Sequence, residues 1–256
     1  MRVHDDLGDP ADRPDRVGRI VSLVPSLTES VAATSPGLVV GATRWCTYPP
    51  DLDVRRIGGT KNPDVPAIVA LAPDVVLANE EENREPDVAA LRSAGLAVWV
   101  TRIRTLDEAL TSLDRMLTLA CGLPRPGWLD QAAAAWSAVV PVAREPVRAI
   151  VPIWRRPWMV LGSDTFAGDL LTRLGVVNVY AGHPERYPRV PVDELRQAGA
   201  DLVVLPDEPY PFGAHDGPEA FGDLPAALVS GRHLTWYGPS LAEAAGVLRC
   251  QLAAVG

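Results

Sequence analysis

The fold class is decided by the stretch Arg19-Ile20-Val21-Ser22-Leu23-Val24-Pro25-Ser26-Leu27-Thr28-Glu29. Its apolar run, residues 20–24, predicts a buried strand that ends at Pro25. Ser26 and Glu29 stand three residues apart, the spacing of a capping box, so a helix is expected to begin there. A buried strand that leads directly into a helix is typical of a parallel sheet covered by helices.

Strands and helices alternate outward from this stretch, with one long interruption. Residues 106–140 carry leucines at helical spacing, and no strand is predicted among them. We therefore expect an α/β protein whose two sheets are separated by a helical segment. The further strands are expected at 74–78, 97–101, 149–153 and 201–205, and the further helices at 66–71, 84–94, 164–174 and from 239 onward.

The two halves of the chain also resemble each other. In each half a polar helix start is followed by a glycine, a pair of valines and a Tyr-Pro dipeptide. Two such halves predict two Rossmann-like lobes with a ligand cleft between them, at the carboxyl ends of the strands. The matching segments are Ser26-Leu27-Thr28-Glu29 with Ser163-Asp164-Thr165, Gly37 with Gly175, Val39-Val40 with Val176-Val177, and Tyr48-Pro49 with Tyr187-Pro188.

The expected division of the chain has four parts. Residues 1–18 are polar, with five aspartates, and are expected to be a disordered N-terminal extension. Residues 19–104 form the first α/β lobe, residues 105–145 a bridging helical segment, and residues 146–256 the second α/β lobe.

Charge and cysteine content exclude several classes of protein. The formal net charge is −8, from 24 Lys and Arg against 32 Asp and Glu, and no block of basic residues occurs, so nucleic acid is not an expected partner. Cys46, Cys121 and Cys250 stand far apart with no CxxC motif, which favours three small buried side chains, with one disulfide left open.

Localisation depends on the first eighteen residues. They contain neither the basic start and apolar run of a secretory signal nor a lipid-attachment cysteine, and no stretch approaches the roughly 20 apolar residues of a membrane span. With Met1 as the native start we expect a cytoplasmic protein. If the N-terminus has been trimmed, we expect an extracytoplasmic one.

Enzyme motifs are weak, so we expect a binding protein with no catalytic residues and no intrinsic cofactor. Gly58-Gly59-Thr60-Lys61 lacks the order of a P-loop, and Ser163 fits a helix cap better than a nucleophile. The four histidines have no metal-site spacing, so no metal ligands are expected. Glu80-Glu81-Glu82 would suit either a general acid/base pair or a solvated loop after a strand.

Candidate ligand contacts lie in loops at strand ends. Loop aromatic rings beside arginines offer flat stacking surfaces and anion-binding groups, although the same rings could simply plug the ends of the lobes. For Trp158→Ala we expect lost affinity with stability nearly unchanged. The first wall comprises Trp45, Tyr48, Lys61, Asn62, Glu81, Glu82, Asn83 and Arg84, and the second comprises Trp154, Arg155, Trp158, Tyr187, Phe212, Trp236 and Tyr237.

Three segments give the chain a family resemblance. Residues 19–29, the Tyr48-Pro49-Pro50 loop and residues 68–77, together with the long helix that follows, resemble class III periplasmic binding proteins, the receptors of cobalamin, haem and ferric-siderophore importers. The resemblance is greatest to the cobalamin-binding branch, of the helical-backbone metal receptor type. It implies two lobes bridged by a long rigid helix, a monomer, and a corrin contact by Tyr48.

The resemblance has departures on the first lobe. The cobalamin receptors carry aromatic residues where Thr60 and Asn79-Glu80 stand here. They also dock on their permease through one glutamate on each lobe, and Pro66 stands at the first of these positions. Asp193 or Glu194 would serve on the second lobe.

These features lead to ranked expectations for function. The first is a solute-binding protein for a metal chelate or corrinoid that serves an ABC importer. The alternative is a cytoplasmic carrier, sensor or partner subunit of the same fold. An enzyme that uses Glu81 or Glu82 with Lys61 or His183 ranks last.

Overall fold

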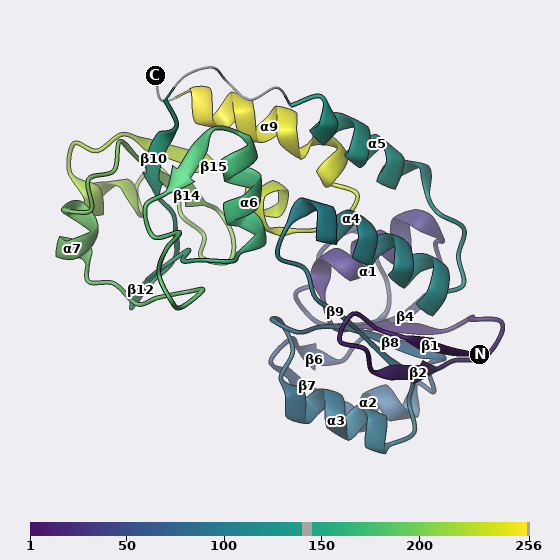
Figure 1. Cartoon of the computed structure of the whole chain (residues 1–256). Coiled ribbons are helices and arrows are strands. Elements are labelled where there is room, and N and C mark those ends of the chain that lie inside the picture. The colour runs from purple at the N-terminus through teal and green to yellow at the C-terminus, as the bar shows by residue number, and fades with distance from the viewer. Residues whose placement is uncertain (140–144, 255–256) are drawn as a thin grey trace. The chain divides into compact units, whose positions relative to one another are not determined.

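The computed structural model describes residues 1–139 and 145–254, which form two compact units (Figure 1). Unit 1 comprises Met1–Ile103, Asp107–Asp130 and Tyr237–Pro239. Unit 2 comprises Arg104–Leu106, Gln131–Trp236 and Ser240–Gly256. Each unit contains its own parallel sheet, as the alternation of strands and helices predicts.

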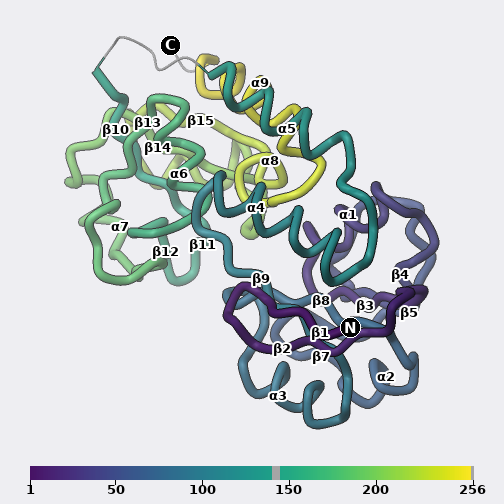
Figure 2. The backbone as a smooth tube through the Cα atoms, turned by 45° about the vertical axis from the view of Figure 1, so that its right-hand side comes forward, coloured from purple at the N-terminus to yellow at the C-terminus, as the bar shows by residue number. Residues whose placement is uncertain are grey.

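The sheet of unit 1 has five parallel strands in the order β5-β4-β3-β8-β9. Helices α2 and α3 cover one face and α1 and α4 the other (Figures 1 and 2). The strands are β3 (Ile20–Ser22), β4 (Val39–Ala42), β5 (Arg55–Arg56), β8 (Val75–Asn79) and β9 (Val98–Thr101), and the helices are α1 (Pro25–Thr34), α2 (Val65–Ala70), α3 (Glu85–Ser93) and α4 (Leu106–Arg115). A short antiparallel hairpin, β6 (Gly58–Gly59) and β7 (Asn62–Pro63), lies between β5 and α2.

The stretch 19–29 forms the expected strand and helix, but the helix begins one residue earlier than the capping-box prediction. Its N-cap is Val24, whose side chain makes no cap hydrogen bond, and Pro25 occupies the first turn. Proline has the backbone angle of a helix start built in, so it sets the start in place of Ser26. Ser26 is buried inside the helix.

The sheet of unit 2 has four parallel strands in the order β13-β10-β14-β15. Apart from the two-residue edge strand β5, the strands of unit 1 lie in the same order along the chain as those of unit 2, namely second, first, third, fourth, so the two sheets share one core topology. Helices α6, α8 and α9 pack on one side, and α7 and η2 lie on the other (Figures 1 and 2). The strands are β10 (Val147–Ile150), β13 (Val176–Asn178), β14 (Leu202–Pro206) and β15 (Ala226–Val229); the helices are α6 (Phe166–Arg173), α7 (Val192–Arg196), η2 (Pro218–Phe221), α8 (Gly231–Thr235) and α9 (Leu241–Ala253).

Two local predictions in unit 2 differ from the structure. The strand expected at 149–153 is broken into β10 and β11 (Pro152–Arg155), and β11 forms an antiparallel hairpin with β12 (Trp158–Val160). The cap of α6 is Thr165, whose hydroxyl accepts a hydrogen bond from the N–H of Gly168 at 3.3 Å, and not Ser163. Asp164 has φ 55°, which turns the chain between the expected cap and the helix.

The helical segment forms α4, the π-helical turn η1 (Met116–Ala120) and α5 (Gly127–Ser137). Asp107–Asp130 group with unit 1 and Gln131–Trp236 with unit 2, so this boundary between the units falls inside α5. A separate bridging part at 105–145 stays a prediction, and its residues 140–144 lie outside the described chain. Among the described residues, none of the helices is both long and apolar enough to span a bilayer.

Residues 1–18 are ordered, contrary to the prediction of a disordered extension. Strands β1 (Arg2–His4) and β2 (Pro10–Asp12) pair antiparallel, with Val3 and Ala11 buried. The guanidinium of buried Arg13 donates to the backbone oxygen of Leu119 at 2.6 Å. The alternation of buried and exposed side chains in two three-residue strands is too short a pattern to stand out in the sequence.

Asp5 attaches this hairpin to the edge strand β9. Its carboxylate accepts from the backbone N–H groups of Leu7 and Asp9, both at 2.9 Å, and from Val100 at 3.2 Å. It also pairs with the guanidinium of Arg92 at 2.8 Å. Because an edge strand carries unpaired N–H groups, the N-terminal aspartate protects one side of the sheet.

The three cysteines are free, so no disulfide forms in this structure. Burial raises the pKa of the Cys121 thiol to about 12, and burial also raises the pKa of Cys46. The thiolate is the reactive species, so both should resist alkylation, while exposed Cys250 should react.

We expect one thiol to react with Ellman's reagent in the native protein and three in denaturant. A Cys250→Ser variant should show no fast thiol at all. Two fast thiols in the native wild type would contradict the burial of Cys46 or Cys121.

Candidate functional site

The carboxyl edge of the unit 1 sheet brings together the polar residues that the sequence predicts for a first wall. The turn between β6 and β7 and the loop after β8 meet there. The Asn83 amide donates to the backbone oxygen of Thr60 at 2.9 Å, and the Lys61 ammonium donates to the backbone oxygen of Glu81. These two bonds join the loops into a single surface.

Two buried residues, Asn79 and Thr101, hold this surface in place, and neither was among the predicted site residues. Asn79 Oδ1 accepts from the backbone N–H groups of Glu81 and Glu82, and its amide donates to Thr101 at 3.1 Å. Asn79 thus forms an Asx turn that shapes the loop after β8. The Asn79 side chain is buried, and its role depends on Thr101 of the neighbouring strand, which no local pattern in the sequence indicates.

The charged residues of this wall differ in burial. Glu82 is half-buried, and this burial raises the pKa of its carboxyl, while nearby Lys61 acts in the opposite direction. Arg84 is exposed and pairs with Asp87 at 2.8 Å, on the first turn of α3. Arg84 is therefore held toward its own helix, whereas Glu81 and Glu82 stay on the loop.

Trp45 and Tyr48 present exposed rings on the loop that follows β4. The side chains are 59% and 38% exposed, which is unusual for rings of this size. The loop itself is anchored, because the buried Cys46 thiol contacts Thr28 and Thr43 and the Arg56 guanidinium donates to the Cys46 oxygen at 2.9 Å. An anchored loop with exposed rings is suited to stacking on an apolar ligand.

Gly59, just before the β6–β7 turn, allows the Asn62 side chain to lie close to the backbone of β6. A Cβ atom at Gly59 would stand 2.6 Å from Asn62 Oδ1 and 3.5 Å from Nε1 of Trp45. Any side chain at this position would displace the Asn62 amide. The two distances also show that the predicted contact residues Trp45 and Asn62 both lie next to Gly59.

Replacing Asn83 by alanine should loosen the first wall. The change removes the acceptor for the Asn79 N–H, at 2.9 Å, and the donor to Thr60, so the free energy of unfolding should fall by about 1–3 kcal/mol. Asp53→Ala, at an exposed loop position of the same unit, is the control and should change stability by less than about 0.5 kcal/mol. Equal stability of the two variants in urea unfolding would show that Asn83 does not join the loops.

In unit 2 the predicted aromatic residues form a packed cluster around the β11–β12 hairpin. The Trp158 ring lies parallel to Phe212 at 6.0 Å and edge-on to Phe221 at 5.4 Å. Phe212 is buried in the hydrophobic core of the unit, so its ring is not open to a ligand. Trp154, on the other hand, is 41% exposed and touches only the edge of Tyr210 among the ring pairs of the described chain.

These contacts revise the expectation for Trp158. A ring that packs on two core phenylalanines contributes to stability, so Trp158→Ala cannot leave stability nearly unchanged. For Trp158 and Phe212 we therefore infer the alternative in which the rings close the end of the lobe.

Arg155 is committed to partners within unit 2. Its guanidinium pairs with Asp216 and Glu219 and lies over the Trp158 ring. Asp216 in turn accepts from the Tyr210 hydroxyl at 2.8 Å. Arg155 therefore links the β11–β12 hairpin to residues 216–219. A ligand would have to compete with the two carboxylates for the Arg155 guanidinium.

The remaining aromatic candidates are partly or wholly covered. Tyr187 is half-buried with the Arg186 guanidinium over its ring. Tyr237 is buried in unit 1. Trp236 is buried, and its indole N–H donates to Glu208 at 2.9 Å.

Glu208 lies at the carboxyl end of a strand in the unit 2 sheet and was not among the predicted site residues. It follows β14, is half-buried, and its pKa is raised by burial, with the Trp236 bond acting in the opposite direction. The signal was available, because Pro206-Asp207-Glu208 ends a strand in the same way as Asn79-Glu80 does in the first half.

Asp193 and Glu194, the predicted partner-docking residues, are exposed in the first turn of α7. Helix α7 precedes β14 as α2 precedes β8. Val65-Pro66 of α2 occupies the place of Val192-Asp193 in α7. An exposed carboxylate is therefore present at this position in unit 2, and a proline in unit 1.

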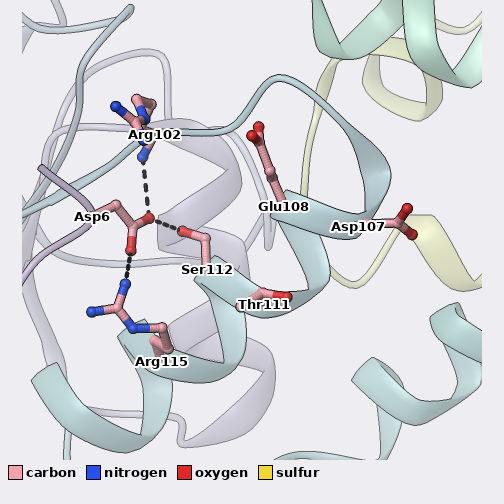
Figure 3. Close-up of a pocket in the computed structure, with 7 residues that line it drawn as sticks. All are labelled: Asp6, Arg102, Asp107, Glu108, Thr111, Ser112 and Arg115. Carbon is pink, nitrogen blue, oxygen red and sulfur yellow. Dashed lines mark hydrogen bonds and ion pairs between the residues drawn. The ribbon is translucent and has the colours of Figure 1, made fainter.

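A shallow polar pocket of about 360 Å³ lies beside the N-terminal hairpin in unit 1 (Figure 3). Asp6 at its centre accepts from Ser112, Arg115 and the backbone N–H of Arg102. These contacts use the acceptor sites of Asp6 for structure. In the described chain, no group of three or more His, Cys, Asp or Glu side chains could hold a metal ion.

Comparison with known proteins identifies relatives of this chain. The family model described as "Periplasmic binding protein" matches residues 20–209. A vitamin B12-binding protein from Vibrio cholerae is 24% identical over 191 residues, which cover 72% of this chain and 68% of the relative. The vitamin B12-binding protein of Salmonella typhimurium is 28% identical over 197 residues, which cover 73% and 71%.

Solved structures share the fold. The periplasmic haem-binding protein RhuT from Roseiflexus has a TM-score of 0.77 at 22% identity, covering 93% of this chain and 99% of that chain. The Helicobacter pylori protein CeuE in a nickel–histidine complex has a TM-score of 0.82 at 13% identity, covering 98% and 87%. The vitamin B12-binding protein BtuF of Vibrio cholerae has a TM-score of 0.72 at 18% identity, covering 93% and 98%.

Proposed function

The chain belongs to the periplasmic binding protein family, and on this premise we propose that it binds a metal chelate of the cobalamin, haem or siderophore type and delivers it to an ABC importer. The observation that carries the proposal is the family match over residues 20–209, which includes strands of both sheets. The family consists of binding proteins, so the chain is not an enzyme and the chelate is its cargo.

The exposed and half-buried side chains of unit 1 support a ligand with both an apolar and a polar surface. Trp45 and Tyr48 offer two rings for stacking. Glu81, Glu82 and Asn62 offer acceptors and an amide on the adjoining loops. We propose these five as the principal contacts of unit 1, with Lys61, Asn83 and Arg84 positioning the loops through the bonds described above.

In unit 2, exposed Trp154 and half-buried Tyr187 are the proposed contacts among the predicted residues. Arg155, Trp158, Phe212, Trp236 and Tyr237 would act by holding these rings and the strand ends in place.

The experiment that tests the proposal is a ligand titration. Absorbance of the purified protein between about 300 and 600 nm would detect a retained chromophore. Fluorescence of the seven tryptophans is then followed with hydroxocobalamin, haem and ferric siderophores. Trp45→Ala should weaken the response to the ligand that binds, while exposed Leu7→Ala should not. No response to any of the three ligands would overturn the proposal.

One observation favours a second candidate, a carrier, sensor or partner subunit that serves no importer. Helix α2 has Pro66 where α7 has Asp193, so the docking position in unit 1 carries no carboxylate. This candidate keeps the protein in the cytoplasm, whereas the importer role requires an extracytoplasmic position, as for the periplasmic family in general.

Cell fractionation with capture of partners separates the two candidates. Recovery of a permease on the tagged protein, lost in an Asp193→Ala, Glu194→Ala double variant, supports the importer role. Recovery in the cytoplasmic fraction, with chelate bound and no permease, supports the carrier.

A further inference from the structure

A single arginine bonds along the whole loop of unit 1 that carries the exposed rings. Arg56 lies on the edge strand β5, and its guanidinium donates to three backbone oxygens of residues 43–52, the loop between β4 and β5. We propose that Arg56 is a positioning residue of the ligand site, which fixes the Trp45 and Tyr48 rings through the loop backbone. The binding part of this inference rests on the proposed function, whereas the holding of the loop does not.

The three oxygens belong to the beginning, the middle and the end of the loop. Nη1 of Arg56 donates to Thr43 at 3.2 Å and to Cys46 at 2.9 Å, and Nη2 donates to Leu52 at 3.0 Å. Backbone oxygens outside helices and sheets need donors from side chains or water. A planar guanidinium has several N–H groups in fixed directions, so it can serve all three oxygens at once. These three bonds, the Arg56 clamp, hold both ends of the loop beside β5.

The positions of the two rings depend on the clamped backbone. Trp45 and Tyr48 each come two residues after a clamped oxygen. Both rings are exposed, so packing in the core does not fix them. Their spacing is therefore set by the backbone of the loop, and the Arg56 clamp sets that backbone.

The neighbouring arginine separates the effect of the clamp from the effect of charge. Arg55 precedes Arg56 on the same strand, is exposed, and in the described chain its side chain makes no hydrogen bond or ion pair. The backbone of β5 pairs with β4 at Gly41 and Ala42, and this pairing needs neither arginine side chain. Replacing either arginine changes the net charge equally, but only the loss of Arg56 removes the clamp.

The buried thiol of Cys46 reports on the loop when no ligand is present. Its sulfur lies 3.1 Å from the Thr28 hydroxyl and 3.2 Å from the Thr43 hydroxyl, and the side chain is fully buried. Movement of the loop away from β5 would expose this thiol. Cys121 is also buried in unit 1 but stands outside the loop, so loop movement leaves it covered while unfolding of the unit exposes it.

The first measurement is the rate at which iodoacetamide labels each buried cysteine of the full chain, followed by peptide mass spectrometry in a Cys250→Ser background. Arg56→Ala should speed the labelling of Cys46 by about tenfold or more, because hydrogen bonds from a charged group are strong, and Cys121 should keep its rate. Arg55→Ala should leave both rates as in the wild type.

Two further arms test the geometry of the clamp. Arg56→Lys should label Cys46 at an intermediate rate, because one ammonium does not match three oxygens as a planar guanidinium does. In Arg56→Ala, added methylguanidinium at concentrations well below denaturing ones should slow the labelling of Cys46 again, and methylammonium should not. Unchanged labelling of Cys46 in Arg56→Ala, or equal acceleration of Cys46 and Cys121, would overturn the clamp.

The second measurement is the affinity for hydroxocobalamin, followed by tryptophan fluorescence. Arg56→Ala should weaken binding by about tenfold, because a loop that must first be ordered opposes binding, and Arg55→Ala should bind as the wild type does. Faster labelling of Cys46 with wild-type affinity would overturn the positioning of the rings. Absence of binding by the wild type would count against the proposed function and the binding part of the inference together, and the labelling rates would still decide the clamp.

Discussion

Replacing Asp5 by alanine should lower the free energy of unfolding by about 3 kcal/mol, a large effect for a residue so near the N-terminus. The Asp5 carboxylate is fully buried and accepts from three backbone N–H groups and from Arg92. Alanine leaves these donors without their acceptor and releases the hairpin from the edge of β9. Urea unfolding monitored by tryptophan fluorescence measures the change.

Asp12→Ala is the matched control on the same hairpin. Asp12 pairs with Arg2 at 2.9 Å, but both side chains are mostly exposed, so the loss should stay below about 1 kcal/mol. Similar losses for the two variants would mean that the N-terminal hairpin contributes no more than its surface ion pair.

Trp158→Ala should also destabilise the protein strongly, by about 3 kcal/mol. The variant removes a ring that stacks on Phe212 and meets Phe221 edge-on, and it leaves a cavity beside buried Val190. The Arg155 guanidinium loses the ring beneath it as well. Thermal unfolding followed by circular dichroism should show a clear fall in Tm.

Trp154→Ala is the corresponding control, four residues earlier on the same hairpin. Its ring is 41% exposed and touches Tyr210 only at the edge, so its removal should cost less than about 1 kcal/mol while weakening ligand binding. If Trp158→Ala kept the wild-type Tm and Trp154→Ala lost it, our assignment of the two rings would be reversed.

Much of the first wall could be predicted from the sequence, because its parts follow strands that are recognisable locally. Lys61, Asn62 and the loop 80–84 come directly after short extended segments, and parallel strands place their carboxyl ends at one edge. The structure joins these segments through Asn83 and Thr60. The supporting role of Asn79 was not predictable, since it depends on Thr101 of the neighbouring strand, 22 residues away.

For the second wall, the sequence predicted which residues stand near the strand ends but not which of their rings are exposed. Trp154 and Trp158 stand in the same loop-like segment, and nothing local distinguishes them. Their exposure is decided by the hairpin register, which pairs Arg155 with Trp158 and shifts between Pro152 and Trp154. That register, and the phenylalanines 54 and 63 residues further on that cover Trp158, are properties of the folded unit.

Local patterns in the sequence were sufficient to predict the α/β class, the repeated order of strands and helices and the resemblance to a binding-protein family. These follow from patterns within about ten residues, such as the apolar run before Pro25, and such patterns act before any distant contact forms. Which polar and aromatic side chains pair or pack within the fold depends on contacts that exist only in the folded chain. Asp5 is held by Val100 and Arg155 by Asp216, and partners so far apart in sequence meet only when the chain has folded.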